Sequence, residues 1–427
     1  MALRIERMKY GGAGVGVDAT GAETDVPFTL PGELVDLAVT DSVQVVEASA
    51  QRVEPECRHF GSCGGCQYQH ASYPAQVEIK SGILREILSQ AGAGPVPEIE
   101  LRTGEPWGYR NRVRMRVQAL DGQLRVGHSR RSSNEFLPIE ECPIAAPVLW
   151  RAAEALIQLA AEDAVVRRWL EHVAEVEFFC SADQARVQMA LFLRDADVAR
   201  NEPFTVFCEK VKALLPEMVG ANAEIDPELS RRARRSWPGA TWGAAGLVYE
   251  AAGAKYWVSR GAFFQVNRFL VDEMVALATA GRSGQLAWDL FAGVGLFSRG
   301  LAGGFAEVVA VEGNPVAAGD LAKLAKNVKA VEGATVDFLR RAVLERERPE
   351  LIVMDPPRAG AGAEGCGLLG RIGAPALVYV SCDPVTLGRD LAVLARAGYG
   401  MERVWMVDMF PQTFHLETVV WLRKDAA

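Results

Sequence analysis

From about residue 256 onward, short apolar runs alternate with longer segments that mix apolar and polar residues. Short apolar runs (QLAWDLFAG, EVVAVEG, LIVMDPP, ALVYVSC and RVWMVDMF) are mostly separated by helix-length segments such as PVAAGDLAKLAKNVKA. This alternation predicts a parallel sheet covered by helices on both faces. The last run, ETVVWLRK, follows through a short connection and is expected to pair antiparallel. The pattern therefore predicts a doubly wound α/β domain.

The first part of the chain has a different pattern. Residues 1–56 are short runs separated by Gly-rich turns, as in YGGAGVGVDATG, which predicts a small barrel of the OB type. Residues 74–90 carry apolar side chains at helical spacing after Pro74, which predicts a helix that ends at AGAGP. Farther along, strands such as RVQMALFL are mixed with a helix near APVLWRAAEALIQLAAE. We expect three domains, spanning residues 1–56, 57–255 and 256–427.

The composition is ordinary for a soluble globular protein, with 49% hydrophobic and 23% charged residues among 427. No apolar run approaches the length of about 18 residues that a membrane span needs, so we expect none. No apolar segment follows the charged N-terminus, so we expect no secretory signal. These features predict a cytoplasmic protein, whose eight cysteines are thiols, metal ligands or nucleophiles rather than disulfides.

Charge gives conflicting indications about nucleic acid. The net charge is −8, and phosphate binding depends on Lys and Arg. Local clusters nevertheless occur: an extended strand would place the arginines of YRNRVRMRV on one face. These clusters are either solvated faces or phosphate-binding sites, and they comprise Arg110, Arg112, Arg114 and Arg116, the pair Arg130–Arg131, and Arg231–Arg235.

Ligands of doubly wound sheets bind beyond the carboxyl ends of the strands. There, Asp289, Gly293 and Gly295 form a D-x-x-x-G-x-G turn, in which glycine lets the backbone approach a ligand closely. Glu312 ends the next run, where an acidic side chain typically binds both hydroxyls of a ribose. A turn without a third glycine, beside this acidic partner, favours S-adenosylmethionine over a dinucleotide.

Cys382 is a candidate nucleophile. It stands at the tip of the apolar run ALVYV, opposite the cofactor turn, and a following helix N-terminus would favour its thiolate. Burial as a small hydrophobe better suits the other cysteines outside the N-terminal cluster, Cys180, Cys208 and Cys366. A nucleophilic cysteine beside a methyl donor indicates covalent activation of a poor carbon nucleophile.

That chemistry needs a base to remove the proton that the new group displaces. In FPQTFHLETVVWL, Glu417 begins the final strand, and His415 shares its face at a spacing of two residues. The residues alone leave both as candidates.

A cluster of three cysteines lies in CRHFGSCGGCQYQH, where Cys57, Cys63 and Cys66 follow a C-x5-C-x2-C pattern. Cys142 in EECPI is a candidate fourth ligand. Four thiolates can hold zinc or a cubane iron–sulfur cluster. The three-plus-one grouping favours iron–sulfur over zinc, whose sites more often use two close pairs.

Together these motifs resemble the RNA uridine-C5 methyltransferases, specifically the iron–sulfur-containing members that act on 23S ribosomal RNA. The resemblance covers almost the whole length. It rests on GGAGVGV through PGELV to VEPEC, which is similar to a TRAM domain, on the cysteine pattern, and on FFQVN, DLFAGVG, VEG, DPPRAG, YVSCDP and FPQTFHLETV. It implies a Rossmann-like methyltransferase domain, an N-terminal OB-fold (TRAM) barrel and a mixed α+β iron–sulfur domain between them.

The resemblance also implies roles for single residues. Cys382 would attack C6 of uracil, and Glu417, rather than His415, would remove the proton at C5 after methyl transfer from S-adenosylmethionine. The cofactor, and near Asp355 the target base, would be contacted by Gln265, Phe291, Gly293, Glu312 and Asp355. A [4Fe–4S] cluster would be held by Cys57, Cys63, Cys66 and Cys142.

The resemblance leaves alternatives and shows two departures. We expect a monomer acting on ribosomal RNA; a tRNA uridine, another RNA, another donor such as a folate, and a non-catalytic iron–sulfur RNA-binding protein are the alternatives. Leu296 stands where many relatives carry Asn, and Ala342, in RRAVLE, matches a position after the third strand where relatives often carry an acidic residue or Asn. Neither departure affects Cys382 or Glu417.

Overall fold

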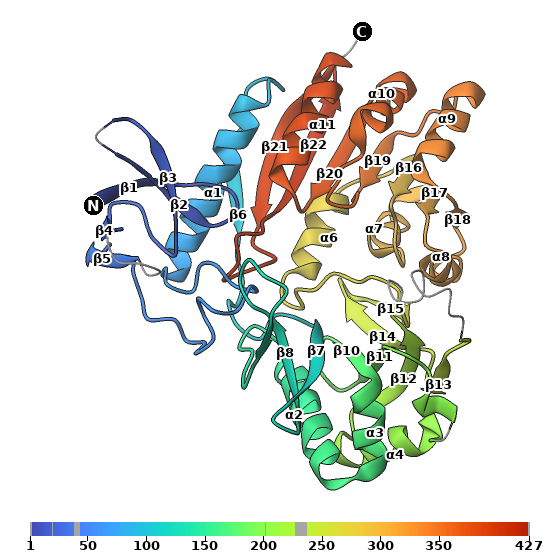
Figure 1. Cartoon of the computed structure of the whole chain (residues 1–427). Helices are drawn as coiled ribbons and strands as arrows, with labels where there is room; N and C mark the ends of the chain where they lie inside the picture. Colours follow the sequence, from blue (N-terminus) through green and yellow to red (C-terminus); the bar gives the residue numbers. More distant parts are fainter. Residues whose placement is uncertain (1, 19, 38–42, 201, 227–236, 426–427) are drawn as a thin grey trace. The chain divides into compact units, whose positions relative to one another are not determined.

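The chain folds into two compact units that interleave along the sequence (Figure 1). The computed structural model describes residues 2–18, 20–37, 43–200, 202–226 and 237–425. Unit 1 comprises Met1–Pro55, Cys66–Pro106 and Phe269–Ala427, and unit 2 comprises Glu56–Gly65 and Trp107–Arg268. The three consecutive domains expected from the sequence stay a prediction. Among the described residues, no helix is both long and apolar enough to cross a membrane.

An eight-stranded sheet forms the centre of unit 1, in the order β18-β17-β16-β19-β20-β22-β21-β6. The five strands from β18 to β20 are parallel, and β22 is antiparallel to both its neighbours, as the sequence predicted. The strands are β6 (Ile99–Arg102), β16 (Gly284–Leu290), β17 (Phe305–Glu312), β18 (Val328–Glu332), β19 (Leu351–Met354), β20 (Ala376–Ser381), β21 (Tyr399–Val407) and β22 (Glu417–Lys424).

Helices cover both faces of this sheet (Figure 1). Trp288 and Leu290 point into one apolar core with residues of α1, α9, α10 and α11. Asp289, between them, points to the opposite face, where its carboxyl meets α7. The helices are α1 (Tyr73–Gln90), α6 (Val271–Thr279), α7 (Leu296–Leu301), α8 (Pro315–Leu321), α9 (Thr335–Glu345), α10 (Gly362–Ile372) and α11 (Pro384–Arg396).

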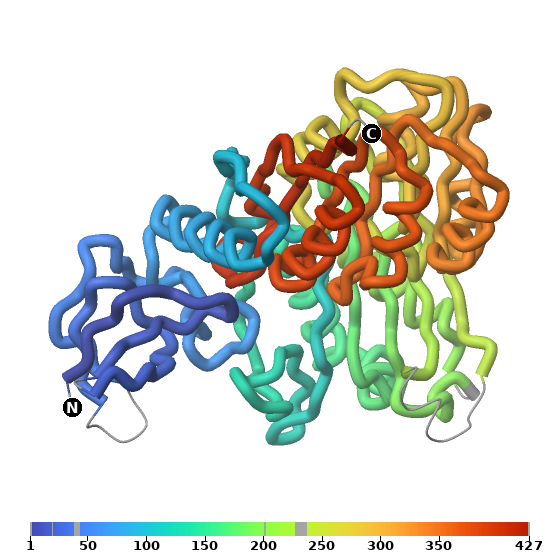
Figure 2. Tube along the Cα trace, turned by 90° about the horizontal axis from the view of Figure 1, so that it is seen from above, coloured from blue at the N-terminus to red at the C-terminus, as the bar shows by residue number. Residues whose placement is uncertain are grey.

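The N-terminal residues of unit 1 form a five-stranded antiparallel sheet in the order β3-β2-β1-β4-β5. In Figure 2 these blue strands lie beside the light-blue helix α1. Met8 and Tyr68 pack with Ile83 of α1 in one buried cluster. The strands are β1 (Ala2–Met8), β2 (Ala13–Val17), β3 (Glu23–Pro27), β4 (Leu34–Asp36) and β5 (Gln44–Glu47).

Unit 2 is built on a seven-stranded mixed sheet in the order β13-β12-β11-β10-β7-β8-β9, with a separate β14-β15 hairpin. The helix expected near 146–162 is present as α2, which packs in the unit's apolar core. The elements are β7 (Arg112–Leu120), β8 (Gln123–Ser129), β9 (Phe136–Pro138), α2 (Pro147–Glu162), α3 (Ala164–His172), β10 (Val173–Cys180), β11 (Val187–Leu193), η1 (Val198–Arg200), α4 (Phe204–Leu214), β12 (Met218–Ile225), β13 (Ala240–Gly243), β14 (Gly246–Ala251) and β15 (Ala254–Ser259).

The sequence pattern did not predict two strands of the eight-stranded sheet, β18 and β6. The segment read as one helix, PVAAGDLAKLAKNVKA, contains the short helix α8 and the start of β18. Its Ala, Leu and Lys residues favour a helix locally, but pairing with β17 decides the structure from Val328 onward. β6 has only four residues and was missed because its pattern is too short to be periodic.

Candidate active site

Strand register brings Cys382 and Glu417 to the same end of the sheet. Ser381 of β20 pairs with Thr418 of β22 in the antiparallel ladder. The next position on each strand is therefore Cys382 on one side and Glu417 on the other. The two residues predicted as nucleophile and base thus adjoin one another through backbone pairing.

Burial and neighbouring charges hold both groups toward their protonated forms. Burial, followed by the carboxyls of Glu417 and Asp355, raises the pKa of the Cys382 thiol to about 12. Glu417 is 2% exposed, and burial raises the pKa of its carboxyl well above the ordinary value, with Asp355 adding to the rise. Among the described residues, Glu417 Oε1 accepts no hydrogen bond. A buried carboxylate without hydrogen-bond donors binds a proton strongly, so Glu417 in its ionised form is a strong base.

Arg358 brings a positive charge to this site, a role that the sequence motifs did not assign to it. It lowers the pKa of both Cys382 and Glu417. Its Nη2 lies 3.3 Å from Nε2 of His415, so the alternative base of the sequence analysis faces a guanidinium. The signal for Arg358 was available in the DPPRAG motif, three residues after Asp355.

The predicted cofactor turn follows β16 directly. Phe291, Gly293 and Gly295 have φ values of 61°, 56° and 90°, so left-handed residues alternate along the turn into α7. Glycine adopts this conformation without a steric penalty. Phe291 does so at a cost of about 1 kcal/mol or more, and strain of this kind concentrates at functional sites.

Glu312 is held against this turn by two main-chain donors. Gly293 N donates to its Oε2 at 2.7 Å, and Asn314 N donates to its Oε1 at 2.6 Å. Asp289 is fully buried, and burial raises the pKa of its carboxyl to about 7; Ser298 Oγ, which donates to Oδ2 at 2.5 Å, opposes the rise. The carboxyl ends of β16 and β17 therefore gather carboxyl groups around an open backbone turn.

A contact from the N-terminal sheet also reaches the site. Asp383 accepts from the main-chain N–H groups of Val385 and Thr386 and caps α11. Its Oδ2 accepts a hydrogen bond from the hydroxyl of Tyr10 at 3.2 Å. Tyr10 lies in the connection between β1 and β2, far along the sequence from Asp383, and nothing local in the sequence indicates this contact.

Gln265 belongs to unit 2, unlike the other predicted cofactor contacts. It is buried, and its main-chain carbonyl accepts from Nδ2 of Asn111 at 2.8 Å. Its expected role toward the cofactor stays a prediction.

The cluster cysteines are divided between the units. Cys57, Cys63 and Cys142 lie in unit 2, and Cys66 begins a segment of unit 1. Burial raises the pKa of the Cys142 thiol to about 11, with smaller contributions from Cys63 and Cys57 in the same direction. In the part of the chain that the structure describes, no group of three or more His, Cys, Asp or Glu residues is arranged to hold a metal ion. Cys180, Cys208 and Cys366 are buried, as expected.

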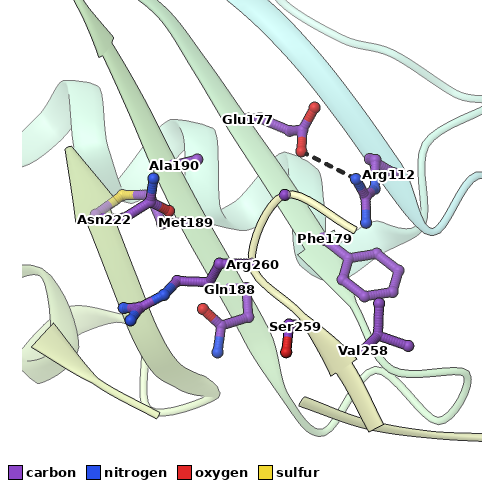
Figure 3. A pocket seen from close by; sticks show the side chains of 11 residues that line it. Arg112, Glu177, Phe179, Gln188, Met189, Ala190, Asn222, Val258, Ser259 and Arg260 are labelled. Carbon is purple, nitrogen blue, oxygen red and sulfur yellow. Dashed lines mark hydrogen bonds and ion pairs between the residues drawn. The ribbon is translucent and has the colours of Figure 1, made fainter. Parts of the chain in front are cut away.

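Two of the three arginines of β7 are paired with carboxylates, and the third, Arg116, donates to the Asn134 carbonyl at 2.7 Å. Arg112 forms an ion pair of 3.3 Å with Glu177 and stacks over Phe179 at 4.3 Å, beside a pocket of about 20 Å³ that has room for one water (Figure 3). Arg114 pairs with Glu175. The pairing favours the solvated-face interpretation over a phosphate-binding stripe. Arg130 likewise pairs with Glu135 at 3.3 Å, and Arg231–Arg235 lie outside the described residues.

The two departures noted in the sequence have different outcomes. Leu296 is buried at the start of α7, next to the cofactor turn. Ala342 does not follow the third strand: it lies within α9 and packs in the apolar core. β18 ends at Glu332 and is followed by Gly333 and Ala334, so that the position after the strand still lacks a polar side chain.

The chain is similar to known proteins along most of its length. The family model for tRNA (Uracil-5-)-methyltransferase matches residues 247–425. A 23S rRNA (uracil(1939)-C(5))-methyltransferase of Chromohalobacter salexigens is 34% identical over 99% of this chain and 89% of its own. The corresponding enzyme of Halomonas elongata is 34% identical over 98% and 89%.

A solved structure supports the fold. The tRNA (uracil-54, C5)-methyltransferase of Pyrococcus abyssi, in complex with S-adenosyl-L-homocysteine, matches with a TM-score of 0.74 and 21% identity over 98% of this chain and 100% of that chain. The fold is thus that of an α/β methyltransferase. By its full-length relatives, the chain belongs to the RNA uracil-C5 methyltransferase family.

Proposed function

We propose that this protein transfers a methyl group from S-adenosylmethionine to C5 of a uridine in 23S ribosomal RNA. The observation that carries the proposal is the register of β20 and β22, which sets a thiol and a buried carboxyl side by side at the strand ends. The names of the two relatives support ribosomal RNA as the substrate class. The name of the structural neighbour makes tRNA the alternative to be tested.

Each residue then has a defined task. Cys382 Sγ forms a bond to C6 of the uracil, and the electron pair of the C5–C6 double bond makes C5 a carbon nucleophile. The cofactor supplies an electrophilic methyl group for C5. Glu417 takes the C5 proton, and the electrons of that C–H bond restore the double bond and expel Cys382. Since C5 is methylated and the thiol is regenerated, the step leaves no change in oxidation state on the protein.

The charges of the site fit a cationic methyl donor. Asp289, Glu312 and Asp355 are carboxyl groups at the ends of three neighbouring strands, and a sulfonium ion is positively charged. Glu312 would hold the ribose hydroxyls, while Phe291 and Gly293 provide the open backbone beside it. A cation near these carboxyls would favour their ionised forms and the Cys382 thiolate.

The thiol must lose its proton before it attacks. In the protein alone its pKa is about 12, so little thiolate exists at neutral pH. Arg358 lowers this pKa, and a bound sulfonium would act in the same direction. Cofactor binding would thereby activate the nucleophile only when a methyl group is available.

We also propose a structural [4Fe–4S] cluster on Cys57, Cys63, Cys66 and Cys142, and an RNA-binding role of the TRAM type for residues 1–56. The support is the number and type of the four thiols, the mutual influence of three of them, and the antiparallel N-terminal sheet. Protein purified without oxygen should contain about four irons and lose them in Cys142→Ser. Stoichiometric zinc in a colourless protein would refute the cluster.

The decisive test of the activity uses labelled S-adenosylmethionine with 23S rRNA and tRNA transcripts. Cys382→Ala should bind the cofactor in calorimetry but transfer no methyl group, while Cys208→Ala, at a buried thiol of unit 2, should remain active. Glu417→Gln should accumulate a covalent protein–RNA adduct, visible as a slow band on a denaturing gel. Full transfer by Cys382→Ala would exclude the covalent route. Mapping 5-methyluridine in cells with and without the gene identifies the RNA.

A further inference from the structure

The segment that leads to Glu417 is clamped by helix α1. Residues 408–416 connect β21 to β22, and Glu417 follows directly. At its start, Lys80 Nζ donates to Asp408 Oδ1 at 2.7 Å and to the Phe410 carbonyl at 2.9 Å. Both side chains of this ion pair are fully buried. A buried pair of this kind fixes its partners in one geometry, because a shift of either leaves a charge unpaired.

A reciprocal amide pair lies in the middle of the segment. Gln76 Nε2 donates to Gln412 Oε1 at 2.9 Å, and Gln412 N donates to Gln76 Oε1, also at 2.9 Å. The two residues are 1% and 3% exposed. Gln412 has a φ of 69°, a conformation that a non-glycine residue adopts at a cost of about 1 kcal/mol or more. The amide pair offsets this strain and sets the path of the chain.

The same segment is bound from the side of the cysteine-rich stretch. The Gln412 carbonyl accepts from the main-chain N–H groups of Gln67 and Tyr68 at 3.0 and 2.9 Å. Phe414 N donates to Gln67 Oε1 at 3.3 Å. Phe414 then packs edge-on against Tyr10, with ring centroids 5.4 Å apart. Contacts at positions 408, 410, 412 and 414 therefore leave the backbone before Glu417 little freedom.

We propose that Gln76 and Gln412 are positioning residues for the base. Their amide pair fixes the 408–416 segment and, through it, the direction in which the Glu417 carboxyl enters the site. This inference rests on the proposed function, because it assigns the pair to one step of that reaction. When the pair is broken, a misplaced carboxyl slows removal of the C5 proton, whereas attack by Cys382 from β20 and methyl transfer continue.

The test measures the covalent adduct and the turnover separately. Gln76→Met, Gln412→Met and the double variant each remove the pair, and Gln412→Gly removes the side chain while keeping the left-handed backbone. Gln90→Met, at an exposed position on the same helix, is the matched control. We expect turnover with 23S rRNA to fall about tenfold to a hundredfold in each variant of the pair, which is the loss that small misplacements of a catalytic group produce.

Accumulation of the covalent protein–RNA adduct is the result that distinguishes a positioning role from a merely structural one. The variants of the pair should accumulate the slow-migrating protein–RNA band, as Glu417→Gln does, and the double variant should lose little more than either single one. Gln412→Gly, which avoids backbone strain, keeps the test valid if the Met variants fold poorly. If turnover of the variants falls only in proportion to the fraction of protein that is folded, and no adduct accumulates, the inference is overturned and the proposed function stays intact. Absence of methyl transfer by the unsubstituted protein would overturn the proposed function, and this inference with it.

Discussion

Among the charged groups that act on Cys382, the carboxyl of Glu417 raises the pKa of the thiol most. The two residues continue the ladder in which Ser381 pairs with Thr418, so the backbone fixes their proximity. Nucleophile and base are therefore one electrostatic system: ionisation of the base makes the thiolate harder to form.

Removing the charge of Glu417 should make Cys382 more reactive in the free protein. Glu417→Gln keeps the shape of the side chain but removes the carboxyl that raises the pKa of the thiol most after burial, so we expect that pKa to fall. The rate of alkylation by iodoacetamide as a function of pH measures this pKa. Cys382→Ala identifies the signal that belongs to this thiol. An unchanged pH profile would show that Glu417 does not contribute to the pKa of the thiol.

Asp289 should make the protein less stable as the pH rises. Burial raises the pKa of its carboxyl from 3.8 to about 7, so between these values the folded state holds a proton that the unfolded state has lost. Unfolding is then accompanied by proton release, and stability declines through this window. Asp289→Asn should remove the decline and be a few kcal/mol more stable than the unsubstituted protein at pH 8.

Urea unfolding at pH 5 and pH 8 without cofactor tests this prediction. Asp337→Asn, at an exposed carboxyl of α9, is the matched control and should follow the unsubstituted protein. Equal pH dependence in Asp289→Asn and the unsubstituted protein would contradict the buried, protonated state of Asp289.

Arg358 should be needed for activity at neutral pH. Because it lowers the pKa of both Cys382 and Glu417, Arg358→Met should raise both values and reduce the active ionic form at pH 7. We expect a loss of about tenfold or more in the methylation rate, with partial recovery at higher pH. The pH–rate profile is the measurement, and Arg125→Met, at an exposed position of β8 in unit 2, is the control. A uniform loss at every pH would point to a contact with RNA instead.

The ion pair of Lys80 and Asp408 should be costly to break. Both side chains are fully buried, so Lys80→Met leaves an unpaired carboxylate and should destabilise the protein by about 3–5 kcal/mol. Replacing both residues, Lys80→Met with Asp408→Leu, should restore most of that loss. Arg167→Met breaks an exposed pair with Glu171 and should cost under about 1 kcal/mol. Thermal unfolding compares the variants; a double variant as unstable as the single one would contradict this account.

The sequence predicted the elements whose pattern is local. Helix α1, helix α2 and the antiparallel β22 follow from periodicity and connection length, and Cys382 and Glu312 follow from their places at strand ends. Residues that act through contacts with sequence-distant partners have no local pattern that would predict those contacts. Tyr10 reaches Asp383 across more than 370 positions, and Gln76 reaches Gln412 across 336, so only the fold brings them together.

The β7 arginines show the opposite limit. Their alternation correctly placed them on one face of a strand, yet the carboxylates that pair with Arg112 and Arg114, which are Glu177 and Glu175, come from β10. The spacing of charged residues within one strand therefore predicts which face of the sheet they occupy. Whether their charges are neutralised depends on the residues of the neighbouring strand.

The pairing of β6 with β21 has a consequence for biosynthesis. Ile99 of β6 lies beside Val404 of β21 in a parallel ladder. β6 therefore cannot pair until about three hundred further residues have been synthesised. At typical translation rates of about 5–20 residues per second, that interval lasts tens of seconds. Unit 2, whose segments are complete by Arg268, can assemble on the ribosome in the meantime. The catalytic sheet, by contrast, can close only after β21 and β22 have been made, so a chain that stalls before them cannot bring its nucleophile and base together.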